Sequence, residues 1–130
     1  MQFLVAIHLP DDYDPSKENA ALMKDISDLN EEMIAKGVRV FVGGLQPATR
    51  AKTIRARNTG GMVVTDGAFV EAKEHVGGFW VLECADLDEA LEWGKKATVA
   101  CRAPVEVRGF NPVPPERLRA RQEAEARAAH

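Results

Sequence analysis

The sequence predicts a single α+β domain in which an antiparallel sheet carries two helices on one of its faces. Two observations support this prediction. Apolar patterns follow one another in the order strand, long helix, several strands, short helix and strand. Both helical segments also begin at residues that commonly cap helices. At 130 residues, the chain is long enough for one domain with one hydrophobic core.

Composition narrows the class of protein. Apolar residues make up 45% of the chain and charged residues 28%, which is typical of a soluble globular protein. The net charge of −3 disfavours broad electrostatic binding to nucleic acid or to an anionic membrane. No apolar run approaches the ~20 residues of a membrane span, and the first residues lack the basic region of a signal peptide. With Cys84 and Cys101 as the two cysteines, we expect a cytoplasmic protein with reduced thiols.

The first half of the chain predicts a strand, a helix and a second strand. Residues 2–9 are apolar on both alternating faces, which is typical of a central strand covered on both sides. A helix is predicted from Pro15 to Lys36, with Asp14 as its N-cap and Gly37 just beyond its C-terminal end. A strand is then predicted over residues 38–45, and a hairpin over residues 51–65.

The second half predicts a strand, a short helix and a last strand. Residues 76–84 are again apolar on both faces. The helix is predicted from Leu87 to Lys96, with Asp86 and Glu89 forming a capping box. After a strand over residues 105–110, prolines end the domain, and an Arg/Ala/Glu tail follows over residues 116–130. We expect this tail to be frayed, or ordered only against a partner.

The two-faced strands have a consequence for assembly. Two helices can cover one face of the sheet, and the other face would then leave apolar side chains in water. Large apolar patches are rarely left uncovered in this way. The simplest cover is the same face of a second copy, so we expect a homodimer.

Five segments in order resemble the YCII-related family, in its DGPF-type branch. They are GGLQP (43–47), KTIRAR (52–57), VTDGAFVEAKEHVGGFWVLE (64–83), DLDEALEW (86–93) and VEVRGF (105–110). The resemblance implies a ferredoxin-like fold over residues 1–110 that pairs sheet to sheet into a dimeric α/β-barrel-like assembly. Residues 111–130 then form a proline-rich exit and a charged tail.

The chain departs from the family pattern at two positions. Ala68 stands where the Asp-Gly-Pro-Phe motif has proline, and His75 stands where the family usually has glutamine. The better-studied YCII branch is thought to use a His-Asp pair, and that histidine motif does not map onto this sequence. Relatives of the DGPF-type branch are often associated with sigma-factor regulation.

The main candidates for chemistry are His8 and Asp66. Asp66 follows a strand and precedes a glycine, so it is either a functional carboxylate or a turn cap. His8 lies on a strand face with Leu4 and Ala6, where a histidine is more often packed in the core than catalytic. If the two share a pocket, the carboxylate would orient the imidazole and the imidazole would move a proton, as in a general-base dyad.

The remaining polar residues give weaker signals. Lys73 and His75 are secondary candidates in a polar run that is usually solvated. Three strand arginines either clamp an anionic substrate or pair with nearby carboxylates, namely Arg55, Arg57 and Arg108. The histidines, of which the last is His130, lack metal-ligand spacing, and the glycine pairs form no phosphate loop. We therefore expect no metal and no cofactor.

Two functional hypotheses follow. The first is a small homodimeric, enzyme-like protein that holds a small organic molecule in a pocket between sheet and helix, with proton transfer as its chemistry if it has any. The alternative is a non-catalytic ligand-sensing or protein-interaction module linked to sigma-factor regulation. A cavity that contains His8 and a carboxylate would favour the enzyme, whereas a packed His8 would favour the module.

Overall fold

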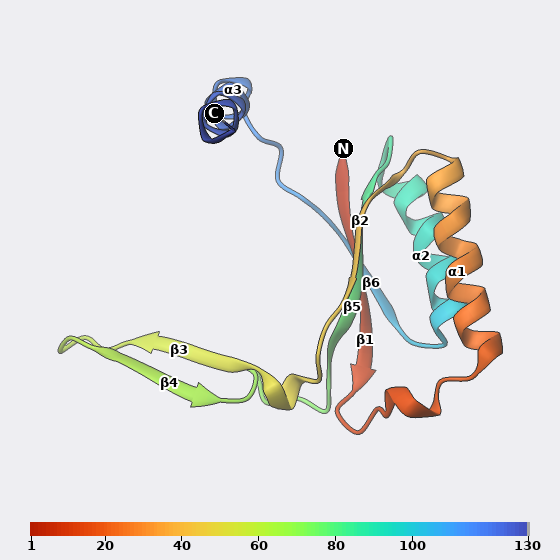
Figure 1. Cartoon of the computed structure of the whole chain (residues 1–130), viewed down its shortest axis with the longest axis horizontal. Helices are drawn as coiled ribbons and strands as arrows, with labels where there is room; N and C mark the ends of the chain where they lie inside the picture. The colour runs from red at the N-terminus through yellow and green to blue at the C-terminus, as the bar shows by residue number, and fades with distance from the viewer. Residues whose placement is uncertain (130) are drawn as a thin grey trace.

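The computed structural model describes residues 1–129 and has the expected α+β architecture (Figure 1). Six elements form a βαββαβ unit, the element order of a ferredoxin-like fold: β1 (Gln2–Pro10), α1 (Ala20–Ala35), β2 (Arg39–Gly44), β5 (Glu74–Glu83), α2 (Leu87–Cys101) and β6 (Val105–Gly109). A hairpin of β3 (Lys52–Ala56) and β4 (Met62–Asp66) is inserted between β2 and β5. A third helix, α3 (Pro115–Ala128), follows the last strand.

The main sheet has the strand order β2-β5-β1-β6, and every neighbouring pair is antiparallel. Both α1 and α2 lie on the same face, which leaves the other face of the sheet without a layer of its own chain (Figure 1). The pairing of β1 with β5 shifts between Ile7 and His8, because Ile7 lies opposite Gly78 whereas His8 lies opposite Val76. Gly77 is therefore the extra residue of a β-bulge.

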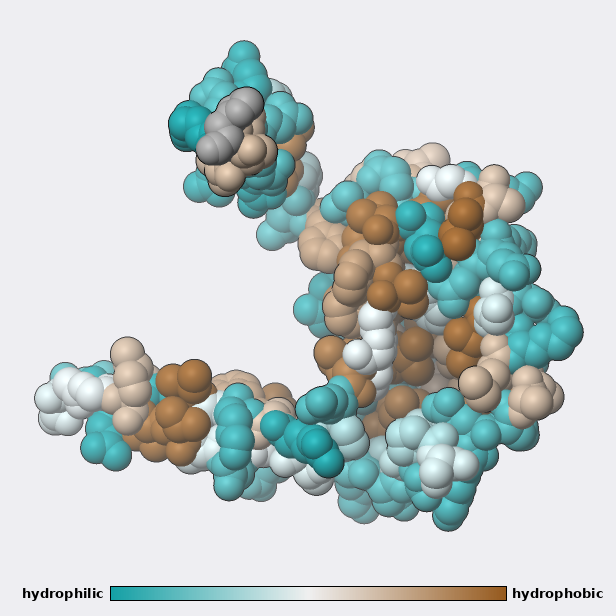
Figure 2. All heavy atoms as spheres, in the orientation of Figure 1, coloured by the Kyte–Doolittle hydropathy of each residue, from teal (hydrophilic) through white to brown (hydrophobic). Residues whose placement is uncertain are grey.

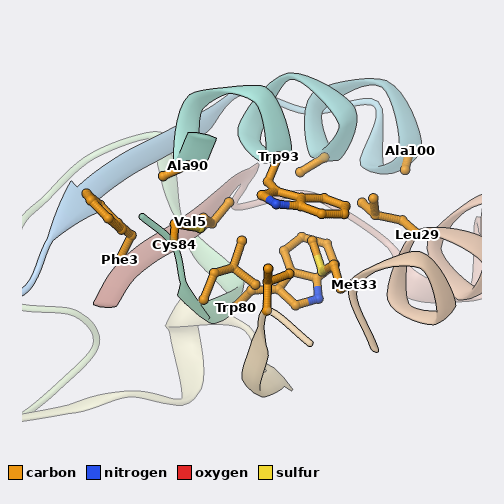
Figure 3. Packing of buried hydrophobic residues seen from close by; sticks show 12 residues of the cluster. Phe3, Val5, Leu29, Met33, Trp80, Cys84, Ala90, Trp93 and Ala100 are labelled. Atoms are coloured by element: carbon orange, nitrogen blue, oxygen red, sulfur yellow. The ribbon is translucent and has the colours of Figure 1, made fainter. Parts of the chain in front are cut away.

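The hydrophobic core fills the space between the sheet and the two helices (Figure 3). The sheet contributes Phe3, Val5 and Trp80, and the helices contribute Met33 and Trp93. Tight burial of these large side chains provides most of the favourable free energy of folding.

Asn30 of α1 satisfies the one polar atom that Trp80 brings into this core. Its Oδ1 accepts from Trp80 Nε1 at 2.9 Å and from Arg39 Nη1 at 3.2 Å, while its Nδ2 donates to the carbonyl of Ile26 at 2.9 Å. Since an unpaired buried donor is costly, this amide fixes how α1 lies against the sheet.

The first helix begins later than the sequence predicted. Asp14 does cap a turn, since it accepts from Ser16 N at 3.0 Å, but that turn is the short 3-10 helix Pro15–Lys17. The chain then becomes extended, and Asn19 caps α1 by accepting from Leu22 N at 2.8 Å. The expected start at Pro15 is therefore wrong, because two capping residues in succession divide the segment. Gly37 has φ +71, as expected for the residue after a helix end.

The second helix is longer than predicted. Asp86 is the expected N-cap, with its Oδ1 accepting from Glu89 N at 2.9 Å, but Glu89 Oε2 accepts from Ala85 N at 2.7 Å rather than from Asp86 N as in the predicted capping box. Helix α2 continues five residues past Lys96 to Cys101, because Ala97 and Ala100 extend its buried face. The lysine pair that suggested a helix end lies within the helix instead, where Lys96 pairs with Glu32 of α1.

The hairpin and α3 both stand away from the compact unit (Figure 1). None of the residues in β3, β4 or α3 is buried. The tail, which we expected to be frayed or ordered only against a partner, is helical over Pro115–Ala128. His130 lies outside the described residues.

Candidate functional site

A chamber of about 210 Å³ lies between the sheet and α1. Its apolar walls come from strands β1 and β5 and from the buried side of α1, and they are formed by Ile7, Leu9, Trp80, Leu22 and Ile26. This is the sheet-to-helix position in which a pocket was expected.

Four glycines complete the wall on the strand side: Gly43, Gly44, Gly77 and Gly78. A Cβ on Gly77 would lie 2.3 Å from Leu9 Cδ1, and one on Gly78 would lie 3.1 Å from the carbonyl oxygen of Gly43. At Gly44 a Cβ would meet no atom within 4 Å, so this position opens onto unfilled space. Glycine weakens a strand interior and commonly marks a site where a ligand approaches the backbone.

Tyr13 and Glu18 form the polar side of the chamber. The Tyr13 hydroxyl hydrogen-bonds to Glu18 Oε1, and both residues line the chamber. Burial, reinforced by Glu18, raises the pKa of Tyr13 to about 12, so the phenol is protonated at neutral pH.

The same two residues also line an adjoining groove of about 390 Å³. The groove includes His8, Asp14 and Cys101 among its lining residues, and it shares Cys101 with the chamber. Burial raises the pKa of the Cys101 thiol to about 11, which makes it a poor nucleophile. Chamber and groove thus share these side chains at the junction of β1, α1 and the end of α2, and we call the two together the hollow.

The chain does not bring His8 and Asp66 together. His8 lines the groove, and its backbone N–H donates to Pro104 O at 2.9 Å. Asp66 ends β4, where it pairs with Lys52 of β3 across the hairpin, and its side chain is 85% exposed. The dyad is therefore not formed within one chain, and a catalytic role for either residue stays a prediction. Asp66 is a cross-strand ion-pair partner here rather than the turn cap considered above.

His75 forms the histidine–aspartate pair that the structure does contain. Its Nδ1 lies 2.6 Å from Asp11 Oδ1, and its Nε2 lies 2.8 Å from Val70 O. Since both ring nitrogens face acceptors, the doubly protonated imidazolium fits this position best. The Val70 carbonyl first, and then Asp11, raise the pKa of His75 above its ordinary value of 6.5. The pair ties the segment after the hairpin to the end of β1.

Comparison with known proteins gives this arrangement a family. The model of the YCII-related domain matches residues 1–109, which covers the whole βαββαβ unit and the hairpin. The chain belongs to the YCII-related domain family. A similar protein is an uncharacterized protein of Rhizobium meliloti (strain 1021), 37% identical over 79 residues. That match covers 61% of this chain and 63% of the relative, so it spans less than two thirds of the relative's length.

The other candidate residues of this YCII-related chain lie outside the hollow. Lys73 is exposed, and its backbone carbonyl accepts from Asp11 N at 2.8 Å. Arg55 stacks over the Phe69 ring at 4.7 Å, and Arg108 pairs with Glu106 at 3.0 Å. These two arginines therefore have partners within the chain.

Sequence reasoning missed Tyr13, Glu18 and Asp11 in the YCII-related chain. Tyr13 and Glu18 flank the short 3-10 helix Pro15–Lys17, where the sequence predicts the start of a long helix, and nothing in their spacing points to a shared pocket. The glycine pairs were a usable signal, because two pairs in strands that become neighbours indicate a wall without side chains. Among the helices of residues 1–129, none has the length and apolarity needed to cross a membrane.

Proposed function

We propose that the protein binds a small, neutral and largely apolar organic molecule in the chamber between the sheet and α1. The open space at Gly44 is the observation that carries this proposal. A Cβ at Gly44 would meet no atom within 4 Å, whereas a Cβ at Gly43, Gly77 or Gly78 would meet Phe41, Leu9 or the Gly43 carbonyl oxygen, so packing within the chain accounts for those three glycines. The unfilled space beside Gly44, near Trp80, Leu22 and Ile26, suits an apolar ligand.

The charges of the lining define the ligand class. The chamber is lined by no lysine, arginine or histidine, and Glu18 is its one ionisable carboxyl group. Tyr13 and Cys101 are neutral at physiological pH, and the raised pKa of each extends this neutral range further. An anionic ligand would lose its hydration without gaining a cation, so it is disfavoured. A hydroxyl group on the ligand would find an acceptor in Glu18 or Tyr13.

Proton transfer is the chemistry that the neighbouring groove supports. His8 lines this groove together with the carboxylates Asp14 and Glu18, which is the combination that favours an enzyme. The alternative is a non-catalytic ligand-sensing or protein-interaction module linked to sigma-factor regulation, and the ligand-sensing part of it is supported by Tyr13 and Cys101. Their raised pKa values keep the phenol and the thiol in the protonated, weakly nucleophilic form, so they suit binding without reaction.

The proposal includes three finer assignments. Asp66-Gly67-Ala68-Phe69 and the segment after it support placement in the DGPF-type branch. The uncovered sheet face supports a homodimer that pairs sheet to sheet. The composition and the pair of free cysteines support a cytoplasmic location.

Three related compounds test the ligand class: naphthalene, 2-naphthol and 2-naphthoate, titrated by calorimetry. We expect 2-naphthol to bind most tightly, naphthalene more weakly because it lacks the hydroxyl group, and 2-naphthoate most weakly because of its charge. Failure of all three to bind, or tightest binding of 2-naphthoate, would overturn the proposed ligand class.

The same probe separates enzyme from sensor. The C1 hydrogen of 2-naphthol exchanges with solvent when a base removes the hydroxyl proton, D₂O delivers a deuteron to C1 of the naphtholate, and a base then removes the original C1 proton. Mass spectrometry detects the exchange. Acceleration by the protein that is lost in His8→Gln supports proton-transfer chemistry. Binding of 2-naphthol without acceleration supports the sensing module instead.

A further inference from the structure

The chain exposes more surface than a compact protein of its size. Its accessible surface is 9569 Å², whereas a compact monomer of 14.2 kDa is expected to expose about 6,800 Å². The excess is about 2,800 Å². Interfaces of obligate dimers bury roughly 2,000–5,000 Å² in total, which is about 1,000–2,500 Å² for each chain. The excess accessible surface of one chain is therefore as large as the area that each chain buries in a large, permanent interface.

Two projections on the same side of the molecule, in which no strand or helix residue is buried, contribute to this excess. One is the hairpin of β3 and β4, residues 52–66, which we call the hairpin arm. The other is α3. Both extend on the side of the sheet that is not covered by helices, with an open space between them in front of the bare sheet face (Figures 1 and 2).

The hairpin arm has one apolar face. The cross-strand pairs Ile54 with Val64 and Ala56 with Met62 place these side chains together. Ile54, Met62 and Val64 are 61–68% exposed, and brown residues gather along the arm in Figure 2. The opposite face carries the polar pair Thr53 and Thr65. An isolated two-stranded hairpin is marginally stable in water, so a partner is needed to hold this one.

Helix α3 has the same requirement. It has 14 residues, none of them buried, and Leu118 is its one large apolar side chain. Isolated helices of this length are marginal in water, because nucleation is costly and little packing compensates for it.

The bare sheet face supplies the surface between the two projections. Phe41 and Phe79 lie on it with ring centroids 5.8 Å apart, and Phe41 is 53% exposed. Leu4 of β1 lies on the same face, since it alternates with the core residues Phe3 and Val5. This apolar face therefore lies between the two projections (Figure 1).

We propose that the hairpin arm and α3 clasp a second copy of this chain. The apolar face of each hairpin arm then packs against the partner chain. In a two-fold pair the same patch is offered by both chains, so each copy brings one bare sheet face and one set of arms. The surplus surface of the chain is of the size that this mutual clasp would bury. The inference rests on the proposed homodimer, and it does not depend on what the chamber binds.

Val64→Glu and Thr65→Glu form a matched pair of test variants. They introduce the same charge at neighbouring exposed residues of β4 but on opposite faces of the hairpin arm. Light scattering should give twice 14.2 kDa for the unmodified chain and for Thr65→Glu. For Val64→Glu, the dissociation constant of the dimer should rise at least tenfold. Circular dichroism checks that each variant remains folded.

Hydrogen exchange of the hairpin amides gives a second readout that needs no variant. Packed arms should exchange slowly at high chain concentration and rapidly after dilution below the dissociation constant. A dimer whose hairpin amides exchange rapidly at every concentration, and which Val64→Glu leaves intact, would overturn the clasp while leaving the sheet-to-sheet dimer standing. A monomer at all concentrations would overturn both the clasp and the homodimer, whereas the ligand class is judged by the naphthalene series alone.

Discussion

Replacing Gly44 by valine tests whether the chamber is kept open for a ligand rather than for folding. The new side chain would point into space where a Cβ meets no atom within 4 Å, and the backbone φ of Gly44 is outside the positive range. Gly44 is the exposed last residue of β2, so replacing glycine there contributes at most about 0.5–1 kcal/mol, and each methylene group that the valine buries contributes up to about 0.8 kcal/mol. Because the site is partly open to solvent, we expect the free energy of unfolding to rise by about 1–2 kcal/mol in total.

The assay combines thermal unfolding with ligand titration. At roughly 4 °C per kcal/mol for a chain of this length, Tm should rise by about 4–8 °C at fixed chain concentration. Binding of 2-naphthol should weaken at least tenfold because the valine occupies its space. The control is Gly67→Val, which also enters open space but at φ +97, where a side chain is strained, so its Tm should fall. A lower Tm for Gly44→Val, or unchanged binding, would refute the reasoning.

Three further predictions concern the folded unit. Asn30→Ala should lower the free energy of unfolding in urea by about 2 kcal/mol, because the indole N–H of Trp80 is left without an acceptor, whereas Asn30→Asp should recover much of the loss. Asp86→Ala should cost about 1 kcal/mol by the same measurement, with Asp86→Asn close to the unmodified chain. The His75 ring should titrate above 6.5 by NMR, because its imidazolium is held by the Val70 carbonyl and by a carboxylate. Its contribution to stability is then complete below 6.5 and is lost as the pH rises through the raised pKa, and a ring that titrates at or below 6.5 would contradict this.

The sequence predicted more of the fold than of the candidate site. The βαββαβ order, the cap at Asp86 and the turn at Gly37 depend on neighbours within a few residues, so local patterns were enough to predict them. The division of the first helix at Asn19 was not predicted, because the sequence did not show which of two successive capping residues the long helix would use. The extension of α2 to Cys101 was missed because lysine near a helix end is a weak signal.

What the sequence alone determined is the class of the molecule: an α+β domain of the YCII-related family, with strands apolar on both faces. What the tertiary structure decided is which residues meet. His75 contacts Asp11, 64 positions away, because β5 pairs with β1. Asp66 does not meet His8, because it lies on the hairpin arm. Side-chain partners are set by strand order and register, which depend on packing across the whole domain. A site assembled from such long-range contacts is therefore invisible to local patterns, whereas helix caps and strand periodicity are not.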